Sequence, residues 1–227
     1  MKAENSILHV YLMPGMAANP SIFEYIKLPV DVFEVHLLSW KIPLQEETLS
    51  DYALRMLEEV HHENFALVGV SFGGVVVQEM AKLRTPKRLI IVSSVKSSEE
   101  LPPHMRFAQK TKAYKVLPLG LLNYMHQIEK LPVGNFIKKR IQLYRQYLSV
   151  SEKEYLEWAV ENMVCWNQTE ILPEIIHIHG TADQVFPAKL IKDFIPLKDG
   201  THIMILNKYK WFNKHLPNLL LNKKLAD

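Results

Sequence analysis

The chain has 227 residues, of which 48% are hydrophobic and 22% are charged, and its formal net charge is +3. These values are typical of one globular domain with a substantial core, so we expect a single domain over residues 1–227. The small net charge does not indicate nucleic-acid binding, and no apolar stretch approaches the ~18 residues that span a bilayer.

The N-terminus has an early acidic residue and only a short apolar run, so it does not have the form of a signal peptide. Cys165 is the single cysteine and therefore cannot form an intramolecular disulfide, which favours a reducing compartment. We accordingly expect a cytoplasmic protein with no membrane span.

Positive charge is concentrated in the middle of the chain. Residues 96–145 contain ten Lys and Arg but three acidic residues, whereas the remaining chain has 17 basic and 21 acidic residues. Such a segment can attract an anionic substrate or partner. A solvated helical face explains the same pattern and is the simpler interpretation.

Short apolar segments alternate with helix-like segments over the first 93 residues. The apolar runs have the length of strands and lie at residues 7–13, 32–38, 65–70 and 87–93. Residues 48–61 carry apolar side chains at helical spacing behind Thr48, a candidate N-cap. Residues 72–83 also have the length of a helix. This alternation predicts a mainly parallel sheet with helices on both faces.

The pattern changes after the fourth strand. Residues 95–167 contain no clear strand, only helical stretches separated by Pro and Gly, with a capping-box-like sequence at Ser151 before a helix over 152–166. Strand character returns at 175–179 and weakly at 193–197. A last helix is predicted over 208–215, where Pro217 should stop or kink it. We therefore expect an α/β fold with about six strands and a helical cap insert over about 95–167.

The sequence Gly69-Val70-Ser71-Phe72-Gly73 lies at the junction of a predicted strand and helix. A Gly-x-Ser-x-Gly motif at this junction holds its serine on a sharp turn, where the hydroxyl is exposed as a nucleophile. The Phe72 N–H would then face the reacting oxygen. By itself, however, the motif also fits an ordinary turn.

A serine nucleophile needs a base, and the base needs a group that orients it. Asp183 follows the predicted strand at 175–179, and His202 follows the weak strand at 193–197. The chain order Ser71, Asp183, His202 is the order expected for this architecture. Three partial signals at three strand ends are much stronger than one.

The chain here resembles the α/β-hydrolase superfamily, on the segments GVSFGG, HGTADQVFP and DGTHIMI. The resemblance implies that Ser71 is a nucleophile, that His202 is the general base and then acid, and that Asp183 orients it. It also implies an oxyanion hole formed by the backbone N–H groups of Met16 and Phe72. No metal or organic cofactor is implied.

Two departures from the superfamily pattern concern its shape. Only six residues precede the first strand, so the sheet is expected to be N-terminally shortened. The interval between Asp183 and His202 leaves little room for a full helix. In addition, the loop before Met16 carries Pro14-Gly15 where many relatives have His-Gly. Because the oxyanion donor in this loop is a backbone N–H, we expect the difference to affect the shape of the loop more than its function.

Several residues have a plainer explanation as well. Asp183 could cap a turn, Asp199 is a competing acid, and His202 could be an ordinary loop residue. Phe186 and Ile203 are pocket candidates that core packing explains equally. His177 and His179 share one face of a strand, and we interpret them as structural because no further ligand is spaced for zinc.

These features predict a serine hydrolase that cleaves a carboxylic ester or related acyl bond in a small-molecule substrate. The alternatives are a thioesterase or carbon–carbon lyase acting on an anionic substrate, such as a coenzyme A thioester or a menaquinone precursor. A non-catalytic ligand-binding protein of the same fold is a third hypothesis.

Overall fold

The computed structural model describes residues 7–116, 147 and 152–226. Its centre is a six-stranded sheet with the order β2-β1-β3-β4-β5-β6, and every neighbouring pair is parallel. The strands are β1 (Leu8–Met13), β2 (Phe33–Leu37), β3 (Phe65–Val70), β4 (Arg88–Val92), β5 (Ile176–Gly180) and β6 (Ile195–Leu197). The predicted α/β class and strand number are therefore confirmed.

The strand order places a switch point beside β3. The chain leaves β1 for the edge strand β2, crosses back over β1 to β3, and then continues outward through β4, β5 and β6. In open parallel sheets, the crevice outside the carboxyl ends of the strands at such a point is the usual ligand site. Ser71 directly follows the last residue of β3.

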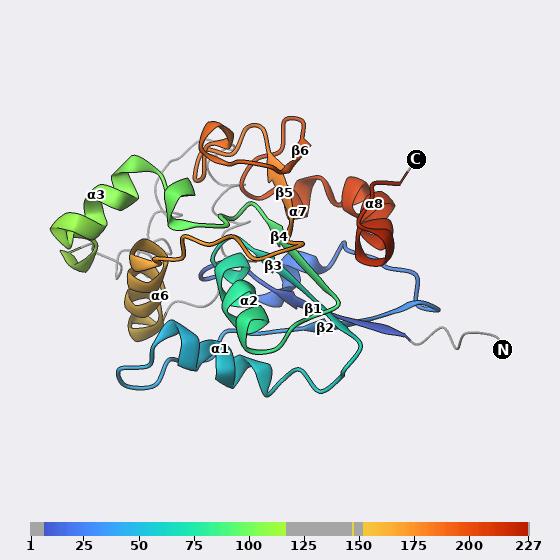
Figure 1. Cartoon of the computed structure of the whole chain (residues 1–227), viewed down its shortest axis with the longest axis horizontal. Helices are drawn as coiled ribbons and strands as arrows, with labels where there is room; N and C mark the ends of the chain where they lie inside the picture. The colour runs from blue at the N-terminus through green and yellow to red at the C-terminus, as the bar shows by residue number, and fades with distance from the viewer. Residues whose placement is uncertain (1–6, 117–146, 148–151, 227) are drawn as a thin grey trace, which may run out of the picture.

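Helices cover the sheet on both faces (Figure 1). One buried cluster joins the sheet to α1 (Leu49–Leu57), α2 (Phe72–Leu83) and α6 (Lys153–Cys165). The opposite cluster joins it to the 3-10 turn η1 (Pro20–Phe23), α7 (Met204–Asn207) and α8 (Tyr209–Asn222). Both faces are thus apolar, which explains the uninterrupted burial of β3 and β5.

The last helix differs from its prediction. Pro217 lies inside α8, which continues to Asn222 instead of ending near residue 215. Proline removes one backbone hydrogen bond from a helix, but Leu216, Leu219 and Leu220 bury their side chains in the cluster behind the sheet. Their burial stabilises the turns beyond the proline.

The interval between Asp183 and His202 contains no α-helix, as predicted, but only the 3-10 turn η5 (Ala188–Leu190) and the three-residue strand β6. Helix α6 begins at Lys153 behind Glu152, whose side chain makes no capping hydrogen bond. Ser151, the predicted capping residue, lies outside the described residues.

Most of the predicted cap insert also lies outside the described residues, which omit 117–146 and 148–151. Its described parts are η2 (Ser98–Glu100), α3 (Pro103–Thr111), η3 (Ala113–Val116) and α6. In Figure 1, α3 and α6 lie at the same end of the molecule. A cap over 95–167 stays a prediction. Within the described ranges, none of the helices combines the length and apolarity that crossing a bilayer requires.

Candidate active site

Ser71 stands on a strained turn between β3 and α2. Its φ of 54° and ψ of −123° lie in a region that non-glycine residues rarely adopt. Three hydrogen bonds hold the residue there: its N–H donates to the Val92 carbonyl at 2.9 Å, and its carbonyl accepts from the Gly74 N–H at 2.8 Å and the Ser94 hydroxyl at 2.7 Å. The sharp strand-to-helix turn predicted from the motif is present.

The two flanking glycines make this turn possible by their small size. A Cβ at Gly69 would lie 2.4 Å from the Gly73 carbonyl oxygen, and a Cβ at Gly73 would lie 2.2 Å from the Pro14 carbonyl oxygen. Neither glycine has a positive φ. Close approach of backbone to backbone, rather than conformational freedom, is therefore what excludes a side chain here.

The structure brings the three predicted polar side chains together. His202 Nε2 lies 2.9 Å from Ser71 Oγ, and His202 Nδ1 lies 2.9 Å from Asp183 Oδ2. An ionised carboxylate can only accept a hydrogen bond, so Nδ1 carries the proton and Nε2 is free to accept from the serine hydroxyl. The loops after β3, β5 and β6 supply one residue each, all at the carboxyl ends of the strands.

Asp183 is buried and well anchored, with 5% of its surface exposed. Its Oδ1 accepts hydrogen bonds from the backbone N–H groups of Val185 at 2.8 Å and Phe186 at 3.0 Å. Burial alone raises the pKa of the carboxyl, but the hydrogen bond and charge of His202, together with the Phe186 N–H, outweigh it and lower the pKa below its ordinary value. The group therefore stays a carboxylate.

A pair of buried histidines lies behind Asp183. His179 Nε2 is 2.8 Å from the Phe186 carbonyl oxygen and 3.7 Å from Asp183 Oδ2. Its Nδ1 is 3.2 Å from His177 Nε2, so both rings lie on one side of β5, as the alternation predicts. Burial lowers the pKa of both rings, which keeps them neutral.

Met16 lies in the turn after β1, close to Ser71: a Cβ on Gly15 would be 3.4 Å from Ser71 Cβ. The Gly15 carbonyl accepts from Trp40 Nε1 at 2.8 Å and from the Ala18 N–H at 3.0 Å. In a trans peptide the N–H points opposite to the carbonyl. The Met16 N–H is thus directed away from Trp40.

The same argument applies to Phe72. The Ser71 carbonyl points to Ser94 and Gly74, so the N–H of the next residue points the other way. Phe72 is also the first residue of α2, where backbone N–H groups have no partner inside the helix. Both predicted donors therefore belong to peptide units that other groups hold in place.

The two predicted pocket residues and the competing acid have different environments in the structure. Phe186 is 1% exposed, and its ring centroid lies 5.4 Å from that of His202, so it packs against the histidine. Ile203 is 49% exposed and is not a core residue. Asp199 uses its backbone N–H to bond the Thr181 hydroxyl, and His202 pairs with Asp183 rather than with this competing acid.

Three residues near the site escaped the sequence interpretation. Trp40 and Ser94 hold the two peptide units, and the Tyr155 hydroxyl accepts a hydrogen bond from the Ala17 N–H at 3.3 Å. They come from separate segments and belong to no motif. No sequence signal could have identified them, because their relevance depends on contacts across the fold.

No protein-family model and no curated protein matches the chain. Solved structures do match. An esterase from Exiguobacterium antarcticum is 15% identical, with a TM-score of 0.66 over 94% of this chain and 91% of that one. An esterase from Thermogutta terrifontis is 17% identical, with a TM-score of 0.64 over 91% and 86%.

A third similar structure is the RedJ thioesterase from the prodiginine biosynthetic pathway of Streptomyces coelicolor. It is 14% identical, with a TM-score of 0.58 over 88% of this chain and 80% of that one. At such low identity the likeness concerns the fold, which agrees with the parallel sheet and the turn at Ser71. The chain therefore has the α/β-hydrolase fold.

Proposed function

We propose that this protein is a serine hydrolase that cleaves carboxylic esters through an acyl-enzyme on Ser71. The supporting observation is the continuous chain of two 2.9 Å hydrogen bonds from Ser71 Oγ through His202 to Asp183. Such a chain makes a serine hydroxyl nucleophilic, because the imidazole takes its proton and the carboxylate stabilises the resulting imidazolium. The esterases of the same fold are consistent with this chemistry.

The proposed reaction has two halves. Ser71 Oγ attacks the ester carbonyl while His202 Nε2 takes the hydroxyl proton; the bond to the alkoxy group then breaks, and His202 returns the proton to the leaving alcohol. In the second half water attacks the acyl-enzyme with His202 again as base, which releases the acid and restores the serine. Asp183 stays ionised throughout.

The oxyanion formed in each half would be stabilised by the Met16 and Phe72 N–H groups. Removal of one such donor costs ~3 kcal/mol of transition-state stabilisation in comparable sites. The anchored carbonyls of Gly15 and Ser71 support this role, since peptide units that are already oriented need no reorganisation during the reaction.

The test is labelling with a fluorophosphonate, combined with turnover of p-nitrophenyl esters of increasing chain length. We expect wild type to label and turn over, Ser71→Ala to do neither, and Asp183→Asn to lose roughly 10⁴ in kcat because its histidine takes the wrong tautomer. Ser39→Ala, which removes an exposed serine hydroxyl, is the control and should behave as wild type. Equal labelling of Ser71→Ala would disprove the assignment.

Thioesters are the second substrate class to test, because a thioesterase shares the fold. The basic segment over 96–145 supports an anionic thioester substrate less strongly than its charge count suggests. Lys96, for example, is buried and contacts Glu100 and the carbonyls of Lys192 and Asp193, so it cannot meet a substrate. On α3, Arg106 and Lys110 are exposed. If they receive an anionic substrate, Arg106→Glu/Lys110→Glu should raise KM for acyl-CoA and leave KM for p-nitrophenyl esters unchanged.

A non-catalytic binding role is the outcome to be excluded. It would be indicated by a ligand that raises the melting temperature and is recovered unchanged. The cytoplasmic location likewise stays a prediction based on the single cysteine, Cys165, which is free in the structure.

A further inference from the structure

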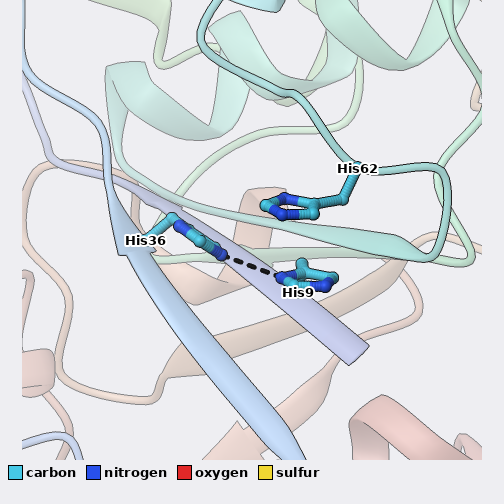
Figure 2. A group of neighbouring side chains, drawn as sticks. All are labelled: His9, His36 and His62. Atoms are coloured by element: carbon cyan, nitrogen blue, oxygen red, sulfur yellow. Dashed lines mark hydrogen bonds between the residues drawn. The ribbon is translucent and has the colours of Figure 1, made fainter. Parts of the chain in front are cut away.

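Three histidines from separate segments gather at the end of β1 away from Ser71. His9 lies on β1, His36 on the edge strand β2, and His62 in the loop between α1 and β3 (Figure 2). One ring nitrogen from each lies within 4.8 Å of the others, and His9 Nδ1 is 3.0 Å from His36 Nε2. The proposed hydrolase chemistry uses none of the three.

The strand register explains why two of them meet. His9 pairs with Glu34 and Tyr11 pairs with His36 across the β1–β2 ladder. Side chains two residues apart in a strand share a face, so His9, Tyr11, Glu34 and His36 lie on the same side of the sheet. This is the side covered by α1, and the chain leaving α1 brings His62 over the other two rings.

Glu34 provides a carboxylate beside the rings. Its Oε2 lies 3.4 Å from His9 Nδ1, and its Oε1 lies 3.8 Å from His36 Nε2. The Glu34 side chain is 59% exposed, so it can move by the small distance that ligation requires. Three imidazoles and one carboxylate are a donor set typical of zinc.

A buried hydroxyl orients the third histidine. Tyr11 is 1% exposed, and its hydroxyl lies 2.7 Å from His62 Nδ1 and accepts from the His61 N–H at 3.1 Å. In metal sites the nitrogen of a histidine that does not bind the metal is usually held by such a polar partner. Tyr11 thereby leaves His62 Nε2 as the nitrogen available to a metal.

We propose that His9, His36, His62 and Glu34 form a binding site for Zn²⁺. Ligand nitrogens around a tetrahedral zinc at ~2.0–2.1 Å are about 3.4 Å apart, close to the present spacing of His9 and His36. The His9 and His62 rings are stacked, with 3.4 Å between centroids and an interplanar angle of 3°. Parallel rings cannot direct their lone pairs to one point, so binding tilts the His62 ring out of the stack.

The site's position assigns it a structural role. It joins the edge strand β2 to β1 and to the loop before β3, and edge strands are held on one side only. His9 lies four residues before Met13 on β1, and Met13 pairs with Gly69 next to the turn at Ser71. The metal site is therefore separated from the candidate active site. Zinc should therefore raise stability and leave ester hydrolysis unchanged, which keeps this inference independent of the proposed function.

The experiment is titration of the untagged, full-length chain with Zn²⁺, followed by calorimetry and thermal unfolding. His36→Ala and His62→Ala are the test variants. His61→Ala is the matched control, because it removes the neighbouring exposed histidine and keeps the backbone N–H that bonds Tyr11. We expect one Zn²⁺ per chain and a raised melting temperature in wild type and control, and at least tenfold weaker binding in both test variants.

Binding of Co²⁺ to the wild-type protein provides a second measurement, and this measurement remains informative even if a variant fails to fold. We expect bound Co²⁺ to show the intense visible absorption of tetrahedral coordination, and we expect this absorption to disappear when Zn²⁺ displaces the Co²⁺. Absence of binding, an octahedral Co²⁺ spectrum, or equal affinity in the test variants and the control would overturn the proposal.

Discussion

Trp40 Nε1 donates a hydrogen bond to the Gly15 carbonyl oxygen at 2.8 Å, and the Trp40 ring stacks on Phe72 with 5.4 Å between centroids. One indole thus contacts both segments whose backbone N–H groups are proposed to stabilise the oxyanion. Because it touches no reacting group, Trp40 would act as a positioning residue.

Trp40→Phe removes the hydrogen bond and keeps an aromatic ring. The Gly15–Met16 peptide unit then loses one of two donors that orient it, and we expect kcat for p-nitrophenyl esters to fall about tenfold with little change in KM, a part of the 10²–10³ that loss of a whole oxyanion donor costs. Trp166→Phe is the control, since its indole N–H bonds Glu79 away from this loop. Equal kcat in both variants would contradict the role.

Ser94→Ala tests the other peptide unit. The Ser94 hydroxyl donates to the Ser71 carbonyl at 2.7 Å, so its loss should lower kcat several-fold and cost about 1 kcal/mol of unfolding free energy. Ser93→Ala is a close control, because Ser93 is equally buried and its hydroxyl has no hydrogen-bond partner among the described residues. That control should keep full activity; a matching loss there would refute the specific role of Ser94.

Gly73→Ala should destabilise the protein by at least ~2 kcal/mol, because its Cβ would overlap the Pro14 carbonyl oxygen at 2.2 Å. Gly15→Ala is expected to stay within ~1 kcal/mol of wild type, since its Cβ would meet Ser71 Cβ at 3.4 Å and its φ is not positive. Urea denaturation measures both. The reverse order of stability would show that the turn can shift to admit a side chain.

The buried His177 predicts a pH dependence of stability. Burial is the main cause that lowers its pKa well below 6.5, and repulsion from the Lys96 ammonium, and from His179 whenever that ring is protonated, adds to it. As the pH falls through about 6.5, His177 therefore binds a proton in the unfolded chain but not in the folded protein. The stability contributed by the neutral ring is fully present above this pH and is lost as the pH falls toward the folded pKa, by about 1.4 kcal/mol per pH unit.

His177→Gln removes this proton and keeps a polar group near His179. Its unfolding free energy should fall less steeply than that of wild type between pH 6.5 and 5, by about 1.4 kcal/mol per pH unit. Urea denaturation at a series of pH values gives the two slopes. The exposed His104 offers a control, since His104→Gln should retain the wild-type slope; parallel curves for wild type and His177→Gln would contradict the prediction.

Much of the fold could be read from local patterns. Apolar runs identified the six strands, although only weakly at 193–197. Apolar side chains at helical spacing identified α1, whereas α2 was expected because residues 72–83 have the length of a helix. The predicted end of the last helix was wrong. The low helix propensity of Pro217 favours an end there, but α8 continues because Leu216, Leu219 and Leu220 bury their side chains against the sheet. Packing against the sheet is a tertiary effect that a propensity argument does not contain.

The amino-acid sequence by itself determined the three side chains that meet at the candidate active site. Ser71, Asp183 and His202 each follow a strand, and the carboxyl ends of parallel strands lie at one edge of the sheet. Only the tertiary structure decided that Trp40 and Ser94 hold the adjacent peptide units, and that His9, His36 and His62 meet. Those contacts depend on strand register and loop paths between distant segments, which local residue patterns do not specify.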